Sequence, residues 1–430
     1  MKFMALKDCA WNEKTVAGRV DLNSNVVDGR IDGIERFEAS LPTIRYLSEK
    51  GAKVVILAHQ GRPGGDDYVS LAQHATLLEL LLKKPVKFVN QTVGERSRAK
   101  ILDLKAGEIL MLENTRFLAD GNDKGSNEEM AKRTLPQFLG PLIDAVVQDA
   151  LSVAHRGMPD TTGLYYKPNV AGLLMEKEIT GLNHIGEFQR PFTVILGGAK
   201  PADALALVHD LQVVDYILAG GVLAELCFIV DGKKLGKKEQ WLRDKGLVKD
   251  DELGLIRDVR QKIITPIDLA VERNEKRVEI SIGQLPVNDM IFDIGSKTIA
   301  LYQDIIAKSA TIYFKGPPGK FEDERFEKGT REILAAIAAS KAFSFAGGGQ
   351  SHHAIQLYTG GKGLSYLSLA GGALEVYLAG QRLPVLDLLD SWAAQKKWDI
   401  DSNMKKTCIE ANCLHLGRGA MRVPSATRTK

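Results

Sequence analysis

Short apolar runs alternate with amphipathic stretches along nearly the whole chain. The apolar runs have the length of β-strands and cover 16–22, 53–58, 86–90, 108–112, 144–150, 191–196, 213–218, 262–269, 290–294, 311–315, 342–346 and 364–369. The amphipathic stretches have helical periodicity and cover 35–49, 70–83, 93–104, 126–141, 201–211, 222–230, 296–308, 323–340, 351–358 and 384–396. This alternation predicts βαβ units, and therefore an α/β fold with parallel sheets.

A longer helical pattern, 171–188, interrupts the alternation and has no strand character. Because 430 residues exceed what one core usually supports, we expect two domains joined by this helix. The stretch 232–262 is charged and rich in Gly and Lys, which predicts a surface excursion. The expected organisation is an N-terminal domain, an interdomain helix, a C-terminal domain, and a return segment with a basic tail, over 1–170, 171–190, 191–385 and 386–430.

Composition narrows the possible partners and the compartment. A hydrophobic share of 44% and a charged share of 26% are ordinary for a soluble globular protein. The net charge of +3, without a dense basic tract outside the tail, gives little support for a nucleic-acid partner. No apolar run approaches the roughly 18 residues of a membrane span, and the N-terminus lacks a signal-peptide core. Four cysteines do not form a disulfide framework, so we expect a reducing cytoplasm.

Polar and cationic residues follow the predicted strands of the first half. Carboxyl ends of parallel strands meet at one edge of a sheet, where ligands bind. Guanidinium groups form forked bonds with carboxylate and phosphate, so several arginines at this edge predict a ligand with more than one anionic group. The alternative is that each arginine forms a surface ion pair and that Asp21 and Asn23 are turn residues. The candidate residues are Asp21, Asn23, Arg36, His59, Gln60, Gly61, Arg62, Arg116 and Arg156.

Glycine-rich turns follow the predicted strands of the second half. Backbone without a side chain lets phosphate approach a helix N-terminus, as polyphosphate binding requires. The first turn is neither a Walker A loop nor a G-x-G-x-x-G dinucleotide motif, and a Gly-Gly pair after a strand is often only a tight turn. The candidate residues are Gly197, Gly198, Lys200, Glu322, Gly347, Gly348, Gly349, Gln350 and Ser351. Arginines in one half and glycines in the other predict a two-lobed phosphotransferase.

Two clusters suggest a metal but do not predict one. His352 and His353 are adjacent at a predicted helix start, so they point to different faces. Cys408, Cys413 and His415 lack the second ligand pair of a structural zinc site. We therefore expect no structural zinc, and the ligands of any catalytic metal are not identified.

The ordered motifs resemble those of the phosphoglycerate kinase family over residues 14–392. The His59–Gly65 stretch and the Gly220-Gly221-Val222 turn most resemble the archaeal branch. The motifs that carry the resemblance are Arg19-Val20-Asp21-Leu22-Asn23, Arg36 with Leu41-Pro42-Thr43-Ile44, His59-Gln60-Gly61-Arg62-Pro63, Leu112-Glu113-Asn114-Thr115-Arg116-Phe117, Ala154-His155-Arg156, Gly197-Gly198-Ala199-Lys200, Asp293-Ile294-Gly295, Gly316-Pro317 with Phe321-Glu322, Gly347-Gly348-Gly349 and Gly371-Gly372.

The resemblance implies two Rossmann-like lobes, joined by a helix and a hinge, that close over both substrates. It implies reversible phosphoryl transfer between 1,3-bisphosphoglycerate and ADP, giving 3-phosphoglycerate and ATP, with Mg²⁺ bound mainly through the nucleotide and the chain acting as a monomer. By position, Asp21 and Asn23 would contact the glycerate, and Arg36 would reach the transferring phosphoryl group. Arg62, Arg116 and Arg156 would hold the substrate phosphate. Lys200 would neutralise nucleotide phosphates, Glu322 would bind ribose, and the helix after Gly349 would cap phosphate.

The departures from the family pattern lie on the nucleotide side. Ala204 stands where a second lysine is usual, and Lys315 replaces the usual asparagine. Gln350 replaces an acidic metal ligand, Ser351 a threonine, and Ala370 the first of three glycines. These departures leave two alternatives open, which are a catalytically weakened phosphoglycerate-binding paralogue and a kinase of another small phosphorylated acid.

Overall fold

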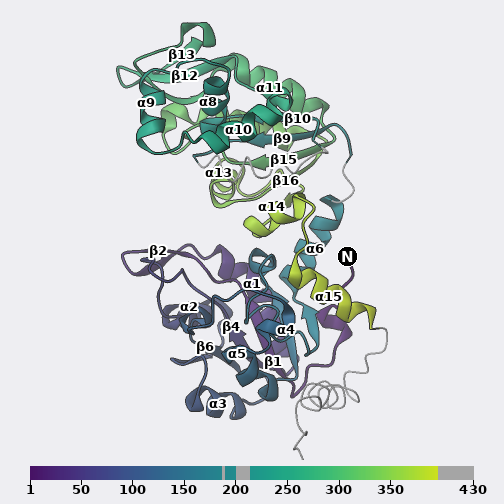
Figure 1. The fold of residues 1–430 in the computed structure, drawn as a ribbon. Coiled ribbons are helices and arrows are strands. Elements are labelled where there is room, and N and C mark those ends of the chain that lie inside the picture. The colour runs from purple at the N-terminus through teal and green to yellow at the C-terminus, as the bar shows by residue number, and fades with distance from the viewer. Residues whose placement is uncertain (186–188, 200–213, 396–430) are drawn as a thin grey trace, which may run out of the picture. The chain divides into compact units, whose positions relative to one another are not determined.

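The computed structural model describes residues 1–185, 189–199 and 214–395, and these form two compact units. The first unit comprises Met1–Ile179 with Leu383–Lys430, and the second comprises Thr180–Arg382. Helix α6 (Leu173–Ile185) begins in the first unit and ends in the second (Figure 1). Each unit contains a six-stranded parallel sheet, which confirms the α/β prediction.

In the first unit the strand order is β5-β6-β4-β1-β7-β8, and every pairing is parallel. The strands are β1 (Thr15–Val20), β4 (Lys53–Leu57), β5 (Val86–Val89), β6 (Ile109–Leu112), β7 (Ala145–Asp149) and β8 (Asn169–Ala171). The main helices are α1 (Glu35–Glu49), α2 (Ala72–Leu82), α3 (Glu95–Leu102), α5 (Thr134–Leu139) and α15 (Pro384–Ala394). The central strands are almost wholly buried, which explains why they appear in the sequence as continuous apolar runs.

Helices cover both faces of this sheet. On one face, Phe37 and Ile44 of α1 and Leu78 of α2 pack against the strands. On the other face, Ile101 of α3 and Leu135 of α5 form a second cluster with the alternate strand residues. The apolar stripes of the helices therefore close two cores around one sheet, as in doubly wound folds.

In the second unit the strand order is β11-β10-β9-β15-β16-β17, again parallel throughout. The strands are β9 (Phe192–Leu196), β10 (Tyr216–Ala219), β11 (Ile263–Ile264), β15 (Thr311–Lys315), β16 (Phe343–Ala346) and β17 (Tyr366–Leu367). The main helices are α8 (Gly221–Val230), α9 (Lys237–Asp244), α10 (Asp250–Val259), α11 (Ser296–Lys308), α12 (Lys328–Ala339), α13 (Gly349–Thr359) and α14 (Gly372–Leu378).

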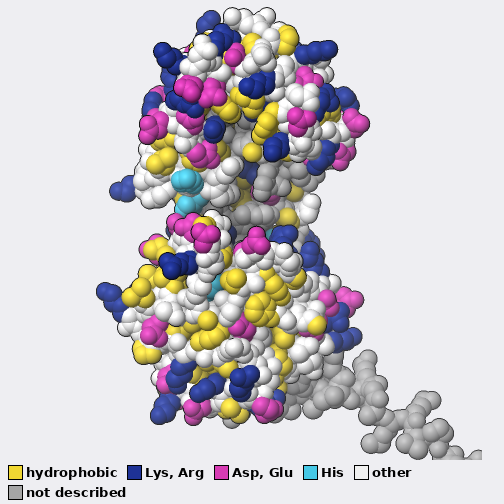
Figure 2. Space-filling model, turned by 90° about the vertical axis from the view of Figure 1, so that its left-hand side faces the viewer, with side chains coloured by type: hydrophobic (Ala, Val, Ile, Leu, Met, Phe, Trp, Pro, Cys, Tyr) yellow, Lys and Arg dark blue, Asp and Glu magenta, His cyan; other side chains and the backbone are white. Residues whose placement is uncertain are grey.

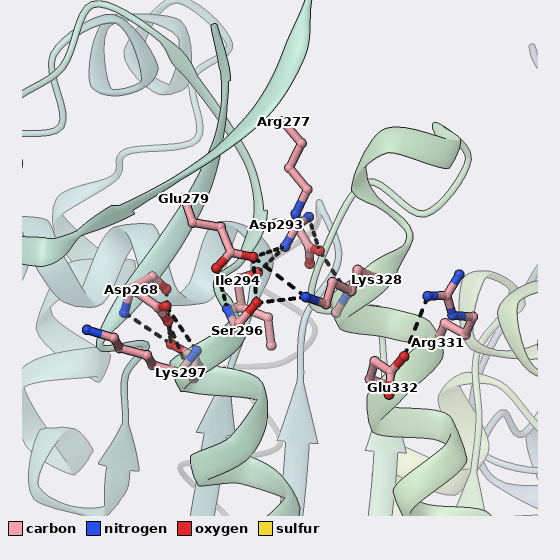
Figure 3. A network of polar contacts seen from close by, with 12 residues as sticks. Asp268, Arg277, Glu279, Asp293, Ile294, Ser296, Lys297, Lys328, Arg331 and Glu332 are labelled. Atoms are coloured by element: carbon pink, nitrogen blue, oxygen red, sulfur yellow. Dashed lines mark hydrogen bonds and ion pairs between the residues drawn. The ribbon is translucent and has the colours of Figure 1, made fainter.

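A small antiparallel sheet is attached to the second unit. Its strands are β12 (Asp268–Arg273), β13 (Lys276–Ser281) and β14 (Met290–Ile294), in the order β13-β12-β14. Figure 3 shows that carboxylates of these strands bind helix N-termini. Asp268 accepts hydrogen bonds from the backbone N–H of Lys297 (3.0 Å) and Thr298, and Asp293 accepts one from that of Gly329 (2.8 Å). Because N-terminal N–H groups lack intrahelical acceptors, these carboxylates fix the small sheet against α11 and α12.

Three segments differ in secondary structure from the sequence-based expectation. Proline divides two of them, and the third contains amphipathic helices. The predicted helix 126–141 divides into α4 (Asn127–Met130), α5 and a 3₁₀ turn, since Pro136 is tolerated only in a first helical turn. The predicted strand 262–269 divides at Pro266 into β11 and β12. The third segment, the expected surface excursion 232–262, is mostly exposed or partly exposed, and it is organised as the helices α9 and α10. The predicted helix 201–211 lies outside the described residues.

The surface carries charges of both signs. On the face shown in Figure 2, basic and acidic side chains are interspersed over each unit, in keeping with the net charge of +3. None of the described helices has both the length and the continuous hydrophobicity of a membrane span.

Asp149, at the end of β7, anchors the start of α6. Its Oδ1 accepts hydrogen bonds from the backbone N–H of Leu174 (3.0 Å) and Met175 (3.1 Å). Gly172 permits this contact, because a Cβ there would lie 2.1 Å from Asp149 Oδ1. Burial raises the pKa of Asp149 to about 7, although hydrogen bonds from Thr43 and the helix backbone oppose the shift.

We expect Asp149→Ala to lower the free energy of unfolding of the first unit by about 2 kcal/mol, since two buried N–H groups lose their acceptor. Asp149→Asn keeps an oxygen acceptor and should cost less. Urea denaturation of both variants measures the difference, and the exposed Asp66→Ala is the matched control.

The pH dependence separates the two variants further. The folded pKa is raised, so the stabilising contribution of Asp149 is complete at acid pH and is lost as the pH rises towards about 7. Asp149→Asn should lack this decline between about pH 4 and 7. Equal pH slopes for wild type and Asp149→Asn would contradict the assignment.

Candidate active site

The carboxyl edge of the first sheet gathers arginine side chains. Arg19 from β1 is fully buried, and its NH2 lies 2.7 Å from His59 Nδ1 after β4. Arg116, after β6, is buried and donates through NH1 to the carbonyl oxygen of Gly61. Arg156 follows β7 and donates to His155 Nε2 at 2.9 Å. The strand register therefore brings the predicted Arg116 and Arg156 into one cluster with Arg19, which was not among the candidate residues.

The pKa of His59 indicates that several guanidinium groups lie close to this ring. Its pKa lies well below the ordinary value because of burial and then because of the charges of Arg19, Arg116, Arg156 and Arg36. The imidazole is therefore neutral at physiological pH. Four guanidinium groups from separate segments act on this one ring, so the charges converge.

The cluster contains fewer anions than cations. Asp160 lies 2.9 Å from Arg19 Nε, and Asp21 forms an ion pair with Arg36. In the described part of the chain, Arg62 and Arg156 form no ion pair with a carboxylate. Burial, the charge of Arg19 and the other guanidinium groups lower the pKa of Arg116 to about 10. This electrostatic imbalance favours a polyanionic ligand.

The remaining predicted residues of the first unit mostly hold the loops. Asn23 Oδ1 accepts a hydrogen bond from Gly61 N at 2.8 Å. Gln60 is fully buried, and its amide bonds with the backbone of Ser24 and with His74 Nε2. Gly61 adopts φ +67°, and a Cβ there would lie 2.4 Å from the carbonyl oxygen of Asp67. These contacts keep the loop after β4 against the loop after β1.

Sequence reasoning missed several residues that organise the cluster. Arg19 belongs to a recognised motif but was not expected at the centre of the site. Asp160 accepts a hydrogen bond from Thr115 Oγ1 at 2.7 Å in addition to its ion pair, and Ser152 donates to Asp21. The sequence does not show that Arg19 is buried. The one local signal is that Arg19 is a charged residue within an otherwise mainly apolar strand.

The strand ends of the second sheet meet through their glycines. A Cβ at Gly197 would lie 2.2 Å from the carbonyl oxygen of Pro317, and one at Gly221 would lie 2.6 Å from that of Gly198. The backbone N–H of Gly198 donates to Pro317 (2.8 Å), and that of Gly221 donates to Pro318 (3.0 Å). These amides therefore bind the neighbouring turn, and the glycines permit turns after β9, β10 and β15 to touch.

A pocket opens beside these turns, with a volume of about 420 Å³. The glycine turns, α8, α9 and β14 form its walls. The lining includes the predicted residues Gly198, Glu322 and Gln350, and the side chains of Glu322 and Gln350 are exposed. A volume of this size suits one nucleotide.

The triple glycine leads into α13. Gly348 is the N-cap, with φ +94°, and Gly349 begins the helix. The first-turn N–H groups of a helix point along its axis and favour an anion. Ser351 is buried, and its Oγ accepts a hydrogen bond from Gly316 N at 2.8 Å, so it holds the neighbouring turn. Gly347 packs against Leu374. Lys200 lies outside the described residues.

The pocket offers few ligands for a metal. In the segments that the structure describes, no group of three acidic, histidine or cysteine side chains is arranged to hold a cation. Gln350 supplies one amide oxygen at the pocket. This donor set fits a magnesium ion that keeps water and nucleotide oxygens in most of its coordination shell.

The two sites match phosphoryl transfer between a small acid and a nucleotide. Such a reaction requires positioning and positive charge rather than a covalent nucleophile. The arginine cluster supplies positive charge, and the pocket supplies a cavity beside the N-terminus of α13.

Comparison with known proteins agrees with this geometry. Residues 6–381 match the model of the family described as phosphoglycerate kinase. The phosphoglycerate kinase of Pyrococcus horikoshii is 41% identical over 397 residues, which cover 89% of this chain and 96% of that protein. That of Thermoplasma acidophilum is 37% identical over 388 residues, which cover 87% of this chain and 94% of that protein.

Solved structures give the same result. The crystal structure of phosphoglycerate kinase from Pyrococcus horikoshii OT3 superimposes with a TM-score of 0.84 at 40% identity, covering 92% of this chain and 100% of that chain. The structure of phosphoglycerate kinase from Coxiella burnetii gives 0.74 at 31% identity, covering 91% and 100%. The resemblance inferred from the motifs is thus confirmed, and the chain belongs to the phosphoglycerate kinase family, whose members transfer a phosphoryl group between ATP and 3-phosphoglycerate.

Proposed function

We propose that the arginine cluster of the first unit binds 3-phosphoglycerate and that the pocket of the second unit binds ATP or ADP. The observation that carries this proposal is the convergence of four guanidinium groups on neutral His59, with Arg62 and Arg156 lacking carboxylate partners among the described residues. A ligand that carries both a phosphate and a carboxylate relieves this repulsion.

In the proposed assignment Arg62, Arg116 and Arg156 hold the substrate phosphate. Arg116 is preorganised, because its guanidinium bonds with the Gly61 carbonyl and its backbone N–H donates to Asn114 Oδ1 at 3.1 Å. Arg36 is more exposed and opens α1, so it is positioned to leave Asp21 and reach the transferring phosphoryl group. Asp21 and Asn23 then orient the glycerate.

The chemical step needs no proton transfer. An oxygen of the 3-phosphoglycerate carboxylate attacks the γ-phosphorus of ATP, and the bond from that phosphorus to the β,γ-bridging oxygen breaks. The bond electrons leave with ADP, and 1,3-bisphosphoglycerate forms. Arg36 and the α13 N-terminus stabilise the negative charge that spreads over the equatorial oxygens.

In the pocket, Glu322 is assigned to the ribose hydroxyls, and Gly347–Gly349 with α13 is assigned to the phosphates. Magnesium, when bound, neutralises charge on the β- and γ-oxygens of ATP. Gln350 is the described side chain that we assign to its shell. The roles of Lys200 and Ser351 at the nucleotide remain predictions from the resemblance.

The arginine assignment predicts different kinetic effects at two positions. With ATP, Mg²⁺ and 3-phosphoglycerate, the chain should form 1,3-bisphosphoglycerate in a coupled assay. Arg36→Ala should lower kcat by about 100-fold, because its contact is made to charge that develops in the transition state. Arg156→Ala should mainly raise KM for 3-phosphoglycerate.

The matched control is Arg45→Ala, which removes an exposed arginine from the same helix α1 as Arg36. An Arg36→Ala variant with unchanged kcat and a higher KM would contradict the role of Arg36. Binding of 3-phosphoglycerate without turnover in wild type would instead identify a weakened paralogue.

The metal assignment predicts a weak protein contribution to the magnesium shell. Because Gln350 offers a neutral oxygen, activity should require Mg²⁺ in clear excess over ATP, and Gln350→Asp should lower the magnesium concentration for half-maximal rate. Gln356→Glu is the control, since it adds a carboxylate to the same helix at an exposed position further along. Superimposable titrations of wild type and Gln350→Asp would exclude the assignment.

Closure of the two units during turnover stays a prediction from the resemblance, as do a monomeric state and a cytoplasmic location. Small-angle scattering with light scattering tests the first two. The expected result is a monomeric mass and a smaller radius of gyration when both substrates are bound, and an unchanged radius would contradict closure.

A further inference from the structure

A buried ion pair lines the nucleotide pocket at α8 and α9. Glu225 lies one helical turn beyond Gly221, and Lys238 lies in the first turn of α9. Lys238 Nζ is 3.2 Å from Glu225 Oε1. Both side chains are nearly inaccessible to solvent, yet both line the pocket. Neither residue was singled out by the sequence patterns, and the proposed phosphate and ribose contacts do not use them.

The ammonium group of Lys238 has several contacts that fix its position. Its Nζ donates to the carbonyl oxygen of Ile291 at 3.0 Å, in addition to its contact with Glu225. The ammonium group also lies 4.7 Å from the ring centre of Trp241 and 5.7 Å from that of Phe292. Cation–π contacts and hydrogen bonds together fix the group. Lys238 therefore acts as a support for Glu225.

The two carboxylate oxygens of Glu225 differ in their contacts. Oε1 contacts Lys238, whereas Oε2 is buried and has no hydrogen-bond donor in the described part of the chain. Burial raises the pKa of Glu225 to about 7, although the charge of Lys238 opposes the shift. A buried oxygen without a donor costs free energy, so its retention beside a pocket indicates a donor from the ligand.

The pocket that Glu225 lines has apolar walls that suit a flat ring. Val222 and Ala224 of α8, Trp241 of α9 and Met290 of β14 supply apolar surface to the same pocket. An adenine base presents such a ring with one exocyclic amine as a donor. Hypoxanthine presents a carbonyl oxygen at that position, which a carboxylate oxygen repels.

We propose that Glu225, supported by Lys238, is a specificity-determining residue that accepts a hydrogen bond from the 6-amino group of adenine through Oε2. The proposal rests on the proposed assignment of this pocket to the nucleotide. A purely structural ion pair that joins α8 to α9 would use the same Oε1 contact, but it would not discriminate between bases.

Nucleotides that differ only at the 6-position test the proposal on the wild-type chain. We expect kcat/KM for ATP to exceed that for purine riboside 5′-triphosphate, which lacks the amine, by about tenfold or more, and to exceed that for inosine 5′-triphosphate further. Calorimetric binding of the corresponding diphosphates provides a second readout that does not depend on turnover.

The variant that tests the residue is Glu225→Leu combined with Lys238→Met, because removing one partner alone leaves a buried charge. This double variant should use ATP and purine riboside 5′-triphosphate within about twofold of each other, since only the amine contact discriminates them. The matched control is Glu252→Leu with Lys249→Met, which removes an ion pair of α10 (3.1 Å) whose residues do not line the pocket, and it should keep the wild-type ratio.

The possible outcomes distinguish the role of Glu225 from the assignment of the pocket to a nucleotide. Equal use of ATP and purine riboside 5′-triphosphate by wild type would overturn the role of Glu225 and leave the nucleotide site intact. A preference for GTP would overturn the adenine assignment, because the carboxylate would then accept from guanine N–H groups. Failure of every nucleotide to bind would overturn the proposed function itself. If the double variant does not fold, the wild-type series still decides.

Discussion

Repulsion among buried guanidinium groups is the constraint on which the first unit depends. Arg19 and Arg116 are nearly inaccessible to solvent. The charge of Arg19 lowers the pKa of Arg116, and the charges of both lower the pKa of His59. Asp160 offsets part of this charge, and the Gly61 carbonyl accepts from Arg116. The remaining positive charge is the basis for proposing an anionic ligand at this cluster. Side-chain amides and hydroxyls hold the loops after these strands, so the arrangement persists.

The second unit meets a different constraint, which is the close approach of backbone. The turns after β9, β10 and β15 touch one another, and only glycine fits where they meet. Their amides bond with the adjacent turns, so among the described residues the N-terminus of α13 is the one that we propose for phosphate binding. The small sheet is fixed by carboxylates at helix N-termini, which keeps β14 in place as a wall of the pocket.

These two constraints divide the reaction between the units. Transfer of a phosphoryl group needs positive charge where negative charge develops, and it needs a site that holds the nucleotide without competing for the phosphoryl group. In the proposed function the cationic cluster meets the first need. The pocket, with few cations among its described lining residues, is proposed to meet the second. The buried Glu225–Lys238 pair adds a polar group to a mostly apolar wall, and a polar group in such a place selects the base rather than the phosphates.

The sequence by itself determined the α/β class, most strands and helices, and the family, because hydrophobic periodicity and short ordered motifs are local properties. It also predicted that Arg62, Arg116 and Arg156 follow strands whose carboxyl ends share one edge of a parallel sheet, and that Arg36 opens a helix. Only the tertiary structure decided that Arg19 lies at the centre of that edge, that Gln60 and Ser351 are occupied in holding loops, and that 232–262 forms helices. The sequence also gave no indication that Glu225 and Lys238 form a buried pair. Burial, pairing and the direction of a side chain depend on segments far apart in the chain, and no local pattern records them.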